Sequence, residues 1–514
     1  MSDNGFPAEN RPPRRKIPVS WIWIASTALL CAVFAFASVP GVLAQVRDSA
    51  QAAGQAAGQA ENAQRNRKYT AVIQQVFDFI QRHYVEEVDS KVIFEGAMTG
   101  IFNALDDPYS AFLPESEMKD LNDTTQGSFG GVGLYITKPV GNKPDGQLPF
   151  VEVASPIEDT PGWRAGINPG DLIISIDGEY TDKLSLDEVL GRLRGPPGVV
   201  INLVIRRGEK LEFPVSLTRA VIEVPTAKHA MVGSIGYLKL LTFTPFTADR
   251  AAEAILDFRA KNYTGVILDL RNNYGGLLNS AVDVSSLFLE SGVVVSTKSR
   301  IASENQVFRT RRQALVPSNI PVVVLINRGS ASASEIVAGA LKDRGRAYLI
   351  GENSYGKGSV QQVYPLEAAG FKITTARYYT PSDANIDKAG IPPDRKVSFP
   401  EFTDADSEKL GRLINDNKLP SFVNDNPQAG AAQIEAFAKS LEKEYGLDLT
   451  LLKRLIRNEQ NRTAIAPVYD LEYDVQLQEA VNVINSGSFR SLMQTTKTLK
   501  ALQEEAAGDL AQAS

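Results

Sequence analysis

Apolar residues follow two different periods along this chain, and the change of period divides it into regions. Over residues 67–125 they recur at helical spacing, for example at Val72 and Val76, which predicts a small N-terminal helical region. Beyond residue 400 helical spacing returns, with Leu477 and Val481 on one face, so a second helical region is expected there. The residues between these two regions show the patterns of strands.

Residues 126–220 contain several short runs of β type, among them "FVEVA", "DLIISID" and "VINLVIRR". A helical stretch, "LSLDEVLGRLRG", lies between the runs, and glycines cluster at the start in "GSFGGVGLYI". This pattern predicts a compact, mainly-β module of the size of one domain.

Residues 221–400 alternate between buried-type strands and helices. "TGVILDL" is followed by the turn "RNNYGG" and a helical stretch, and "IPVVVLIN" is followed by "RGSAS" and the helical "ASEIVAGALKD". "RAYLIG" then predicts a third strand. Consecutive units of this kind indicate a largely parallel sheet with right-handed crossovers. Active sites of such sheets gather outside the carboxyl ends of the strands.

The N-terminus carries an export signal. A basic segment precedes an uncharged apolar run over residues 21–39, and Val42 and Ala44 then stand as in a signal-peptidase site. The length of the run suits both a cleaved signal peptide and a retained membrane anchor over 1–44, and both alternatives place the rest of the chain outside the cytoplasm, in the periplasm. The low-complexity stretch 45–66 is expected to be a spacer, partly helical at best.

Composition narrows the class of protein further. The chain has 514 residues, which predicts about two to four domains, and 43% hydrophobic and 22% charged residues, which are ordinary for a folded protein. A net charge of −6 argues against nucleic acid as the main partner. Cys31, the single cysteine, lies inside the apolar N-terminal run, so the exported part has no disulfide and no thiolate metal site.

Lys357 lies between two glycines in "GENSYGKGSVQQVYPL" and admits several interpretations. Gly351 and Gly356-Lys357 have the spacing of a phosphate-binding loop, but such a loop requires Ser or Thr after the lysine and then a helix. Here Gly358 follows, and "SVQQVYPL" predicts a strand, so a nucleotide-binding enzyme is disfavoured. A solvated surface lysine and a catalytic lysine remain as alternatives.

Two turns at predicted strand ends could provide catalytic groups. "RGSASAS" places Ser330, Ser332 and Ser334 at the start of a helix, where free N–H groups favour a developing negative charge. Helix capping would explain one of these serines. The Gly275-Gly276 turn offers N–H groups for an oxyanion hole, although a tight turn alone would also use glycine. Spacing does not choose among the three serines.

A serine nucleophile needs a base. The two histidines, His83 and His229, lie in the N-terminal helical region and before the predicted sheet, so a histidine triad is not favoured. Lys357 can act as the base if burial or nearby positive charge lowers its pKa from about 10.4. In an extended segment, Gln361 would point to the same side as Lys357 and orient its amine. The residues thus predict a Ser–Lys hydrolase.

"RGSASASEIVAGALKD" followed by "GENSYGKGSVQQ" closely resembles the active-site signature of the C-terminal processing peptidases, or tail-specific proteases. The resemblance implies that Ser332 is the nucleophile, Lys357 the base and Gln361 the residue that holds the base. It also implies a ClpP/crotonase-like α/β peptidase core with an inserted mainly-β PDZ domain and helical N- and C-terminal regions. The matches, including "ALDDPYSAFL", cover roughly residues 70–400.

"GVILDLRNNYGGLL" resembles the oxyanion segment of the same family. The resemblance places one oxyanion donor at Gly275 or Gly276 and the other at the N–H of Ala333. Tyr274 departs from the pattern, because proline or serine is commoner there, and this leaves the shape of the turn open.

The 126–220 module resembles a PDZ domain through "GGVGL" and "SPIEDTPGWRAGINPGDLIISIDG". In such a domain consecutive backbone N–H groups bind a C-terminal carboxylate while the peptide adds to the sheet as a strand. The resemblance assigns this carboxylate-binding loop to Gly131, Val132, Gly133 and Leu134. A purely structural β-module is the alternative.

The sequence therefore predicts a serine endopeptidase that cleaves extracytoplasmic proteins near their C-termini, with a PDZ domain that recognises the tail of the substrate. The expected partners are proteins or peptides with free C-termini, and no cofactor, metal or nucleotide is required. Family members often assemble through helical tails, which implies a homo-oligomer, although these helices could equally pack on their own chain. Association with the inner membrane is expected where the N-terminal segment is retained as an anchor. A non-catalytic PDZ scaffold on an inactive peptidase core is the rival. The predicted domains are 1–44 signal peptide or anchor, 45–66 linker, 67–125 helical region, 126–220 PDZ domain, 221–400 peptidase core and 401–514 helical region.

Overall fold

A computed structural model describes residues 40–138, 150–208, 210–398, 404–462 and 467–513. The chain divides into two compact units, Met1–Met98 and Thr99–Ser514, which are described separately below. The predicted signal or anchor run, residues 21–39, lies outside the described residues. Among the helices of the described residues, none has both the length and the apolar character that crossing a membrane requires.

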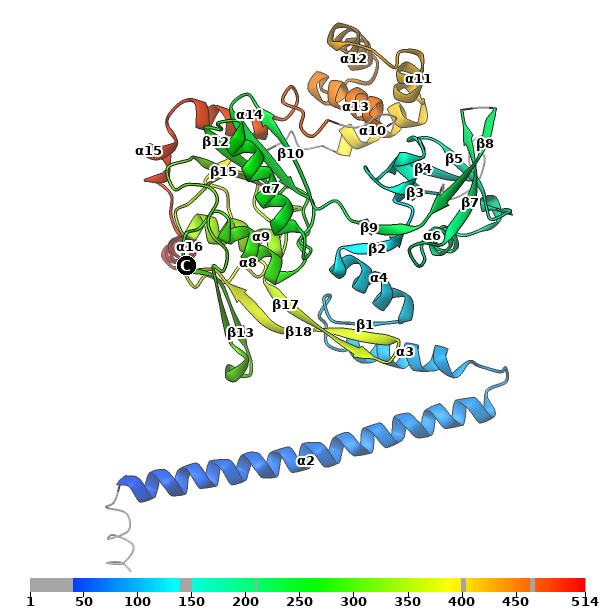
Figure 1. Ribbon diagram of the computed structural model, residues 1–514. Helices are drawn as coiled ribbons and strands as arrows, with labels where there is room; N and C mark the ends of the chain where they lie inside the picture. The colour runs from blue at the N-terminus through cyan, green and yellow to red at the C-terminus, as the bar shows by residue number, and fades with distance from the viewer. Residues whose placement is uncertain (1–39, 139–149, 209, 399–403, 463–466, 514) are drawn as a thin grey trace, which may run out of the picture. The chain divides into compact units, whose positions relative to one another are not determined.

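From residue 40 on, where the structure describes it, the first unit consists mainly of α2 (Pro40–His83), with the start of α3 (Ser90–Asn103). Figure 1 shows α2 as one long helix. The expectation that residues 45–66 are helical only in part is therefore wrong. Alanine and glutamine, which dominate this stretch, both favour helix, and this propensity outweighs the cost of the interspersed glycines.

A six-stranded sheet forms the centre of the second unit. Its strands are parallel except for the edge strand β10, so the predicted parallel arrangement is confirmed. His229 lies on β10, within the sheet and not before it as predicted. The strands in spatial order are β10 (Ala227–Val232), β11 (Ile235–Leu240), β12 (Gly265–Asp269), β15 (Val322–Ile326), β16 (Tyr348–Gly351) and β19 (Arg395–Lys396).

Helices cover both faces of this sheet because alternate residues of its strands point to opposite sides. Leu268 and Val324 face a core made with α7 (Thr247–Ala260), α8 (Leu278–Ser286) and α9 (Ala333–Asp343). Ile267 and Val323 face the opposite core, which is covered by α14 (Val475–Asn485) (Figure 1). Since both faces are buried, the strands read as continuous apolar runs.

A second sheet carries the segment that follows Lys357. Residues 359–366 form a strand, as predicted, and this strand pairs with β18. The segment "AFL" before the PDZ-like module pairs with β18 as well. The strands of this sheet are β1 (Ala111–Leu113), β18 (Ala369–Tyr379), β13 (Val293–Ser299), β14 (Gln306–Arg309) and β17 (Ser359–Leu366), and η2 (Ala302–Glu304) lies between β13 and β14 in the chain.

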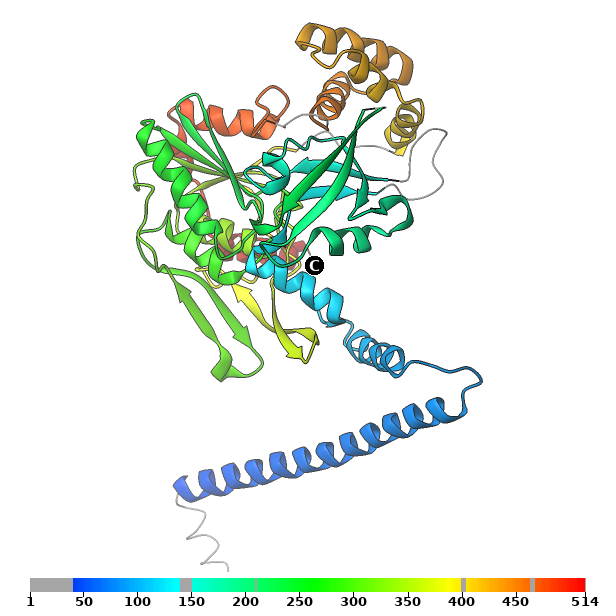
Figure 2. The ribbon, with the colours of Figure 1, turned by 45° about the vertical axis from the view of Figure 1, so that its right-hand side comes forward.

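The predicted PDZ module contains its own sheet and core. Helix α4 (Glu115–Gln126) precedes it, and β2 (Ser128–Gly131) pairs with β9 (Ala220–Glu223) to form a two-stranded stem, seen in Figures 1 and 2. The elements between the two stem strands are β3 (Leu134–Thr137), β4 (Val151–Pro156), α5 (Pro161–Arg164), β5 (Leu172–Ile176), β6 (Glu179–Tyr180), η1 (Thr181–Lys183), α6 (Leu186–Leu193), β7 (Val200–Arg207) and β8 (Leu211–Thr218).

The C-terminal helices form two groups. The first has a core of its own and consists of α10 (Asp404–Asn415), α11 (Lys418–Asp425), α12 (Ala431–Tyr445) and α13 (Leu449–Arg462). The second group packs on the six-stranded sheet and its helices and consists of α14, α15 (Phe489–Met493) and α16 (Leu499–Ala513). Helices are thus present where helical spacing predicted them, whereas the domain limits and the ClpP/crotonase-like assignment stay predictions.

Candidate active site

Three connections leave the carboxyl ends of neighbouring parallel strands. We call them the oxyanion turn (residues 270–277, after β12), the serine turn (327–332, after β15) and the lysine loop (352–358, after β16). Because β12, β15 and β16 are adjacent and parallel, all three connections emerge at the same edge of the sheet.

Ser332 lies at the junction between the serine turn and α9. Its φ of 55° is in the left-handed region, which is uncommon for a residue other than glycine. Its backbone N–H donates to Glu335 Oε2 at 2.8 Å, and its side chain is buried beside Tyr378. A strained backbone of this kind persists only where the surroundings fix it, and such residues cluster at functional sites.

The three serines of the signature differ in how their hydroxyls are used. Ser330 Oγ donates to the carbonyl of Leu270 at 2.8 Å, and Ser334 Oγ donates to the carbonyl of Asn273 at 2.8 Å. For Ser332, the contacts of the described residues include no donation from its hydroxyl to a backbone carbonyl. Ser332 is therefore the serine whose hydroxyl is not committed to holding the two turns together.

Glu335 joins the serine turn to the lysine loop. Besides the N–H of Ser332, its carboxylate accepts hydrogen bonds from Gly356 N–H at 2.7 Å, Lys357 N–H at 2.9 Å and Ser354 Oγ at 2.6 Å. The side chain is fully buried, and burial raises the pKa of Glu335 while these hydrogen bonds act in the opposite direction. One carboxylate thus fixes the backbone of both candidate catalytic residues.

The glycines on either side of Lys357 are required by close packing. A Cβ at Gly358 would lie 2.4 Å from the amide nitrogen of Asp387, and a Cβ at Gly356, whose φ is +89°, would lie 3.0 Å from the amide nitrogen of Gly390. The lysine loop is therefore pressed against residues 387–390 along its backbone. Because its amides bind the Glu335 carboxylate and a strand follows, the loop is unsuited to a phosphate group.

The amine of Lys357 lies 4.7 Å from the ring centroid of Tyr109. Burial lowers the pKa of Lys357, and the positive charge of Lys372 lowers it further, while Asp107 and Glu335 act in the opposite direction. The contacts of the described residues include no hydrogen bond between this amine and the Ser332 hydroxyl. The two groups are thus on loops fastened to each other, and their side chains point to different neighbours.

Gln361 lies on β17 at a point where the pairing register with β18 shifts between Val360 and Gln361. Its amide nitrogen donates to Ser359 Oγ at 2.8 Å and to Thr374 Oγ1 at 3.2 Å. Its predicted contact with Lys357 is not among the contacts of the described residues, and a role in holding the amine stays a prediction.

The oxyanion turn approaches the serine turn closely at its glycines. A Cβ on Gly275, whose φ is +104°, would lie 2.8 Å from the Cβ of Ser332 and 2.9 Å from the amide nitrogen of Ala333. The N–H of Gly275 itself donates to Asn273 Oδ1 at 2.9 Å. For Gly276 and Ala333, no acceptor of the backbone N–H is found among the described residues. Tyr274 is exposed to solvent at 77%.

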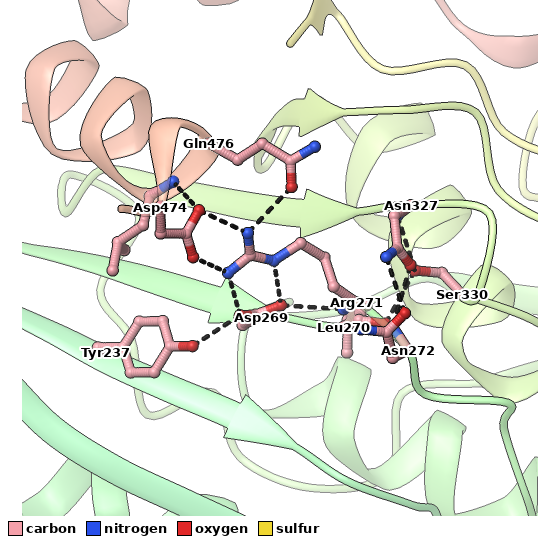
Figure 3. Close-up of polar contacts among 10 residues, drawn as sticks. Tyr237, Asp269, Leu270, Arg271, Asn272, Asn327, Ser330, Asp474 and Gln476 are labelled. Carbon is pink, nitrogen blue, oxygen red and sulfur yellow. Dashed lines mark hydrogen bonds and ion pairs between the residues drawn. The ribbon is translucent and has the colours of Figure 1, made fainter. Parts of the chain in front are cut away.

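Asparagines connect the oxyanion turn to the serine turn, as Figure 3 shows for one pair. Asn272 N–H donates to Asn327 Oδ1 at 3.0 Å, and Asn327 Nδ2 donates back to Asn272 Oδ1 at 2.9 Å. The carbonyl of Asn273 accepts from the N–H of Ala331 at 3.1 Å. The candidate nucleophile and the candidate oxyanion donors are therefore held at a fixed separation.

Glu335, Asn273 and Tyr378 are among the residues of this site that were not predicted from the sequence. Glu335 had a visible signal, because Ser332 and Glu335 have the S-x-x-E spacing of a capping box. Asn273 and Tyr378 had none. Burial raises the pKa of Tyr378 to about 12, while its side-chain hydrogen bond with Ser332 acts in the opposite direction.

The predicted carboxylate-binding loop of the PDZ module lines a pocket. Gly131, Val132, Gly133 and Leu134 border it together with residues of β3 and α6. Thr242 and Thr244, from the segment between β11 and α7, also line this pocket. They flank Phe243, whose backbone N–H donates to the carbonyl of Gly275 at 3.0 Å and whose carbonyl accepts from Leu277 N–H at 2.8 Å. The pocket therefore borders a segment that is bonded to the oxyanion turn.

Comparison with known proteins gives three family matches. Peptidase family S41 matches residues 234–397, the PDZ domain matches residues 152–207, and the N-terminal domain of the activating protease CtpB matches residues 29–116.

Individual proteins are similar over longer stretches. The carboxy-terminal-processing protease of Bartonella bacilliformis is 40% identical over 345 residues, which cover 66% of this chain and 77% of that protein. The chloroplastic carboxyl-terminal-processing peptidase 2 of Arabidopsis thaliana is 38% identical over 333 residues, 62% of this chain and 63% of that protein. A solved photosystem II D1 C-terminal processing protease is 30% identical, with a TM-score of 0.38, and the match covers 63% of this chain and 92% of that chain.

Proposed function

The chain belongs to the carboxy-terminal processing proteases of peptidase family S41, and on this premise we propose that Ser332 and Lys357 form its catalytic dyad. Members of this family are serine peptidases, and a peptidase with a PDZ domain acts on peptides or proteins. The observation that carries the proposal is the Glu335 carboxylate, which binds the backbone N–H groups of both Ser332 and Lys357. This shared contact supports the proposal, because it holds the backbones of both candidate residues at one carboxylate.

In the proposed reaction, Ser332 Oγ attacks the carbonyl carbon of the scissile peptide bond while its proton passes to the neutral amine of Lys357. The N–H groups of Ala333 and of Gly275 or Gly276 bind the oxyanion. The C–N bond then breaks, and the lysine proton passes to the leaving amine. Water then attacks the acyl-serine and gives a proton to Lys357. The ester bond to Ser332 Oγ breaks, which releases the new C-terminal carboxyl group, and the proton returns from Lys357 to Ser332 Oγ.

The reaction requires the amine of Lys357 to be neutral and close to Ser332. Burial and Lys372 both lower the pKa of Lys357, which favours the neutral form. The amine must also leave Tyr109, and a lysine side chain can make this movement by rotation about its own bonds while the loop stays in place. Gln361 is proposed to hold the amine in the working position.

We further propose that the PDZ pocket binds the C-terminus of the substrate. Its loop of consecutive amides, residues 131–134, suits a carboxylate, and β3 offers an edge for an added strand. A bound tail would touch Thr242 and Thr244, next to the segment that is bonded to the oxyanion turn. Binding could therefore both deliver the substrate and act on the catalytic site.

The sequence of residues 1–44 supports an extracytoplasmic location, with export by a cleaved signal or attachment by an anchor. The proposed substrates are consequently extracytoplasmic proteins cut near their C-termini. The helices beyond residue 403 are proposed to contribute to a homo-oligomer at the inner membrane.

The dyad is tested by cleavage of an unstructured fluorescent reporter with a free C-terminus. Ser332→Ala and Lys357→Ala should each reduce kcat by roughly 10⁴-fold. Equal cleavage by the wild type and both variants would reject the dyad. An inactive wild type that still binds the reporter tail would instead support a non-catalytic scaffold. Amidation of the reporter C-terminus should raise KM if the PDZ pocket binds the carboxylate.

A further inference from the structure

The N-terminal end of α14 contacts the root of the oxyanion turn across a separation of 203 residues in the chain. Asp474, which precedes α14, accepts two hydrogen bonds from the Arg271 guanidinium, from Nη1 at 2.8 Å and from Nη2 at 2.6 Å (Figure 3). Gln476 Oε1 accepts a third from Nη1 at 2.9 Å. This bidentate arrangement fixes the plane of the guanidinium as well as its position.

The other edge of the Arg271 guanidinium is bound by the end of β12. Arg271 Nε donates to Asp269 Oδ1 at 2.9 Å, and Asp269 Oδ2 also accepts from Tyr237 Oη at 2.6 Å. Asp269 is fully buried and Arg271 is 9% exposed. Arg271 therefore links α14 to the sheet through a buried ionic network.

The two chain neighbours of Arg271 both bind the serine turn. The carbonyl of Leu270 accepts the hydroxyl of Ser330, and Asn272 forms the reciprocal pair with Asn327 (Figure 3). A displacement of Arg271 would thus move both of these contacts. The serine turn that they hold ends at Ser332.

Gln476 extends the same contact to the lysine loop. Its amide nitrogen donates to the carbonyl of Val397 at 2.7 Å, and Val397 N–H donates to the carbonyl of Gly351 at 2.9 Å. Gly351 is the last residue of β16, and the lysine loop begins directly after it. The end of α14 thus braces the roots of the oxyanion turn and of the lysine loop, and it reaches the serine turn through the neighbours of Arg271.

Packing alone does not require these polar residues. The apolar side chains Leu477, Ala480 and Val483 already bury α14 against the sheet. A buried ion pair adds little to stability, because the cost of removing both charges from water offsets most of their attraction. Asp474 and Gln476 determine the position and direction of the Arg271 guanidinium, which an apolar contact would not set.

We propose that Asp474 and Gln476 are positioning residues of the active site, and that α14 is a working part of the catalytic machinery. They hold Arg271, and through it the oxyanion and serine turns, at the separation that the reaction requires. Both residues lie beyond residue 397, where the match to family S41 ends. The inference rests on the proposed Ser332–Lys357 dyad.

The chain offers a matched control for this inference. Asp448, before α13, accepts a hydrogen bond from Leu451 N–H at 2.9 Å, just as Asp474 accepts one from Leu477 N–H at 3.0 Å. Both aspartates cap a C-terminal helix, and only Asp474 also binds Arg271. Asp474→Ala and Asp448→Ala therefore both remove a helix cap, but only Asp474→Ala also removes the contact with the Arg271 guanidinium.

The test measures kcat and KM of the full chain on the unstructured reporter. Asp474→Ala should lower kcat by about 10- to 100-fold with KM within about twofold, because misplacement of catalytic groups acts on the chemical step. Asp474→Asn, which keeps the shape and the cap, should lose less, and Asp448→Ala should keep kcat within about twofold of the wild type. If Asp474→Ala does not fold, Gln476→Ala decides by the same kcat criterion, and Asp474→Asn decides by a smaller kcat loss that Asp448→Ala does not share.

Amide hydrogen exchange gives a readout that needs no activity. In a Ser332→Ala background, Asp474→Asn should speed exchange in residues 270–276 and 327–332, and Asp448→Ala should not. Wild-type kcat in the Asp474 variants, or an equal loss in the Asp448 variant, would overturn the inference. Activity that survives Ser332→Ala would instead reject the dyad. The hydrogen-exchange result would still show whether Asp474 positions the two turns.

Discussion

The serine turn and the lysine loop are bound by the same carboxylate, and they differ in how far their side chains are fixed. Ser332 has a constrained backbone, a buried hydroxyl beside Tyr378 and neighbouring serines bonded to the oxyanion turn. The backbone of Lys357 is equally well held by Glu335, but its amine rests on an aromatic ring. The proposed nucleophile is thus preorganised, whereas the amine of the proposed base has to move to reach it.

This difference indicates where control over the reaction lies. The hydrogen bonds from both loops to the Glu335 carboxylate already set the distance between the two loops, so little reorganisation of the fold is needed. A rotation of one side chain, which requires no change in the core, would complete the dyad. Four variants separate the contributions of the backbone and of the side chains to activity. They disturb the shared carboxylate, the lysine loop alone, the charge on the amine, and a neighbouring serine.

The largest effect is expected from Glu335→Gln, which disturbs both loops at once. Each carboxylate oxygen of Glu335 accepts two hydrogen bonds. In the glutamine variant an NH2 group replaces one of these oxygens, so that donors would face donors and both hydrogen bonds would be lost. We expect a loss of roughly 10²-fold or more in kcat, measured on the reporter, because nucleophile and base both shift. The exposed Glu442→Gln provides the control and should be neutral. Near-normal turnover by Glu335→Gln would show that the shared carboxylate is not needed to align the loops.

Gly358→Ala should break the lysine loop while it leaves the serine turn in place. The new Cβ would lie 2.4 Å from a backbone nitrogen of Asp387, so the loop must shift. We expect kcat to fall by about 10- to 100-fold. Hydrogen exchange should rise in residues 352–358 and stay unchanged in 327–332. Gly411→Ala, where the added methyl meets no atom within 4 Å, is the control. A rise in both segments would show that the loops behave as one unit.

A smaller effect is expected from the charge at Lys372. The neutral amine of Lys357 is the proposed base, so kcat/KM should rise with pH through the pKa of this group. Lys372→Gln removes a positive charge that destabilises the ammonium form, which raises the pKa of Lys357 and moves the rising limb to higher pH. Activity at pH 7 should then fall by less than about tenfold. An unmoved pH profile, or an equal shift in the exposed control Lys443→Gln, would contradict this assignment of the base.

The smallest effect is expected from Ser334→Ala. This change removes one buried hydrogen bond to the carbonyl of Asn273, which still accepts from Ala331. The free energy of unfolding should fall by about 1 kcal/mol, seen as a decrease of a few degrees in Tm. Cleavage should stay within about threefold of the wild type. Complete inactivation would place the nucleophile at Ser334.

The sequence allowed the sheet and its turns to be predicted because buried parallel strands are continuous apolar runs with glycine and serine at their ends. Spacing alone could not select Ser332. Two of the three hydroxyls are occupied by backbone carbonyls that only the folded sheet brings near them. Likewise, the local sequence around Asp474 indicates only a helix cap, because its other partner, Arg271, lies 203 residues away in the chain.

For the N-terminal helix α2 the prediction was wrong for the opposite reason, because the signal there was local. There, the helix propensity of the alanines and glutamines is visible in the sequence, and it produces a continuous helix although the stretch has low complexity. Glu335 lies between these cases, since its capping-box spacing was visible and its second partner, the lysine loop, was not.

The paired stem at residues 128–131 and 220–223 makes the PDZ module a separable insert. Gly131 and Ala220 are register partners, so the chain enters and leaves through adjacent positions. A short hairpin connection at this point would bypass the module while the flanking strands stay joined. Under the proposed role of the module, a PDZ module with another tail preference, inserted at the same junction, would redirect the peptidase core to new targets without changes to that core.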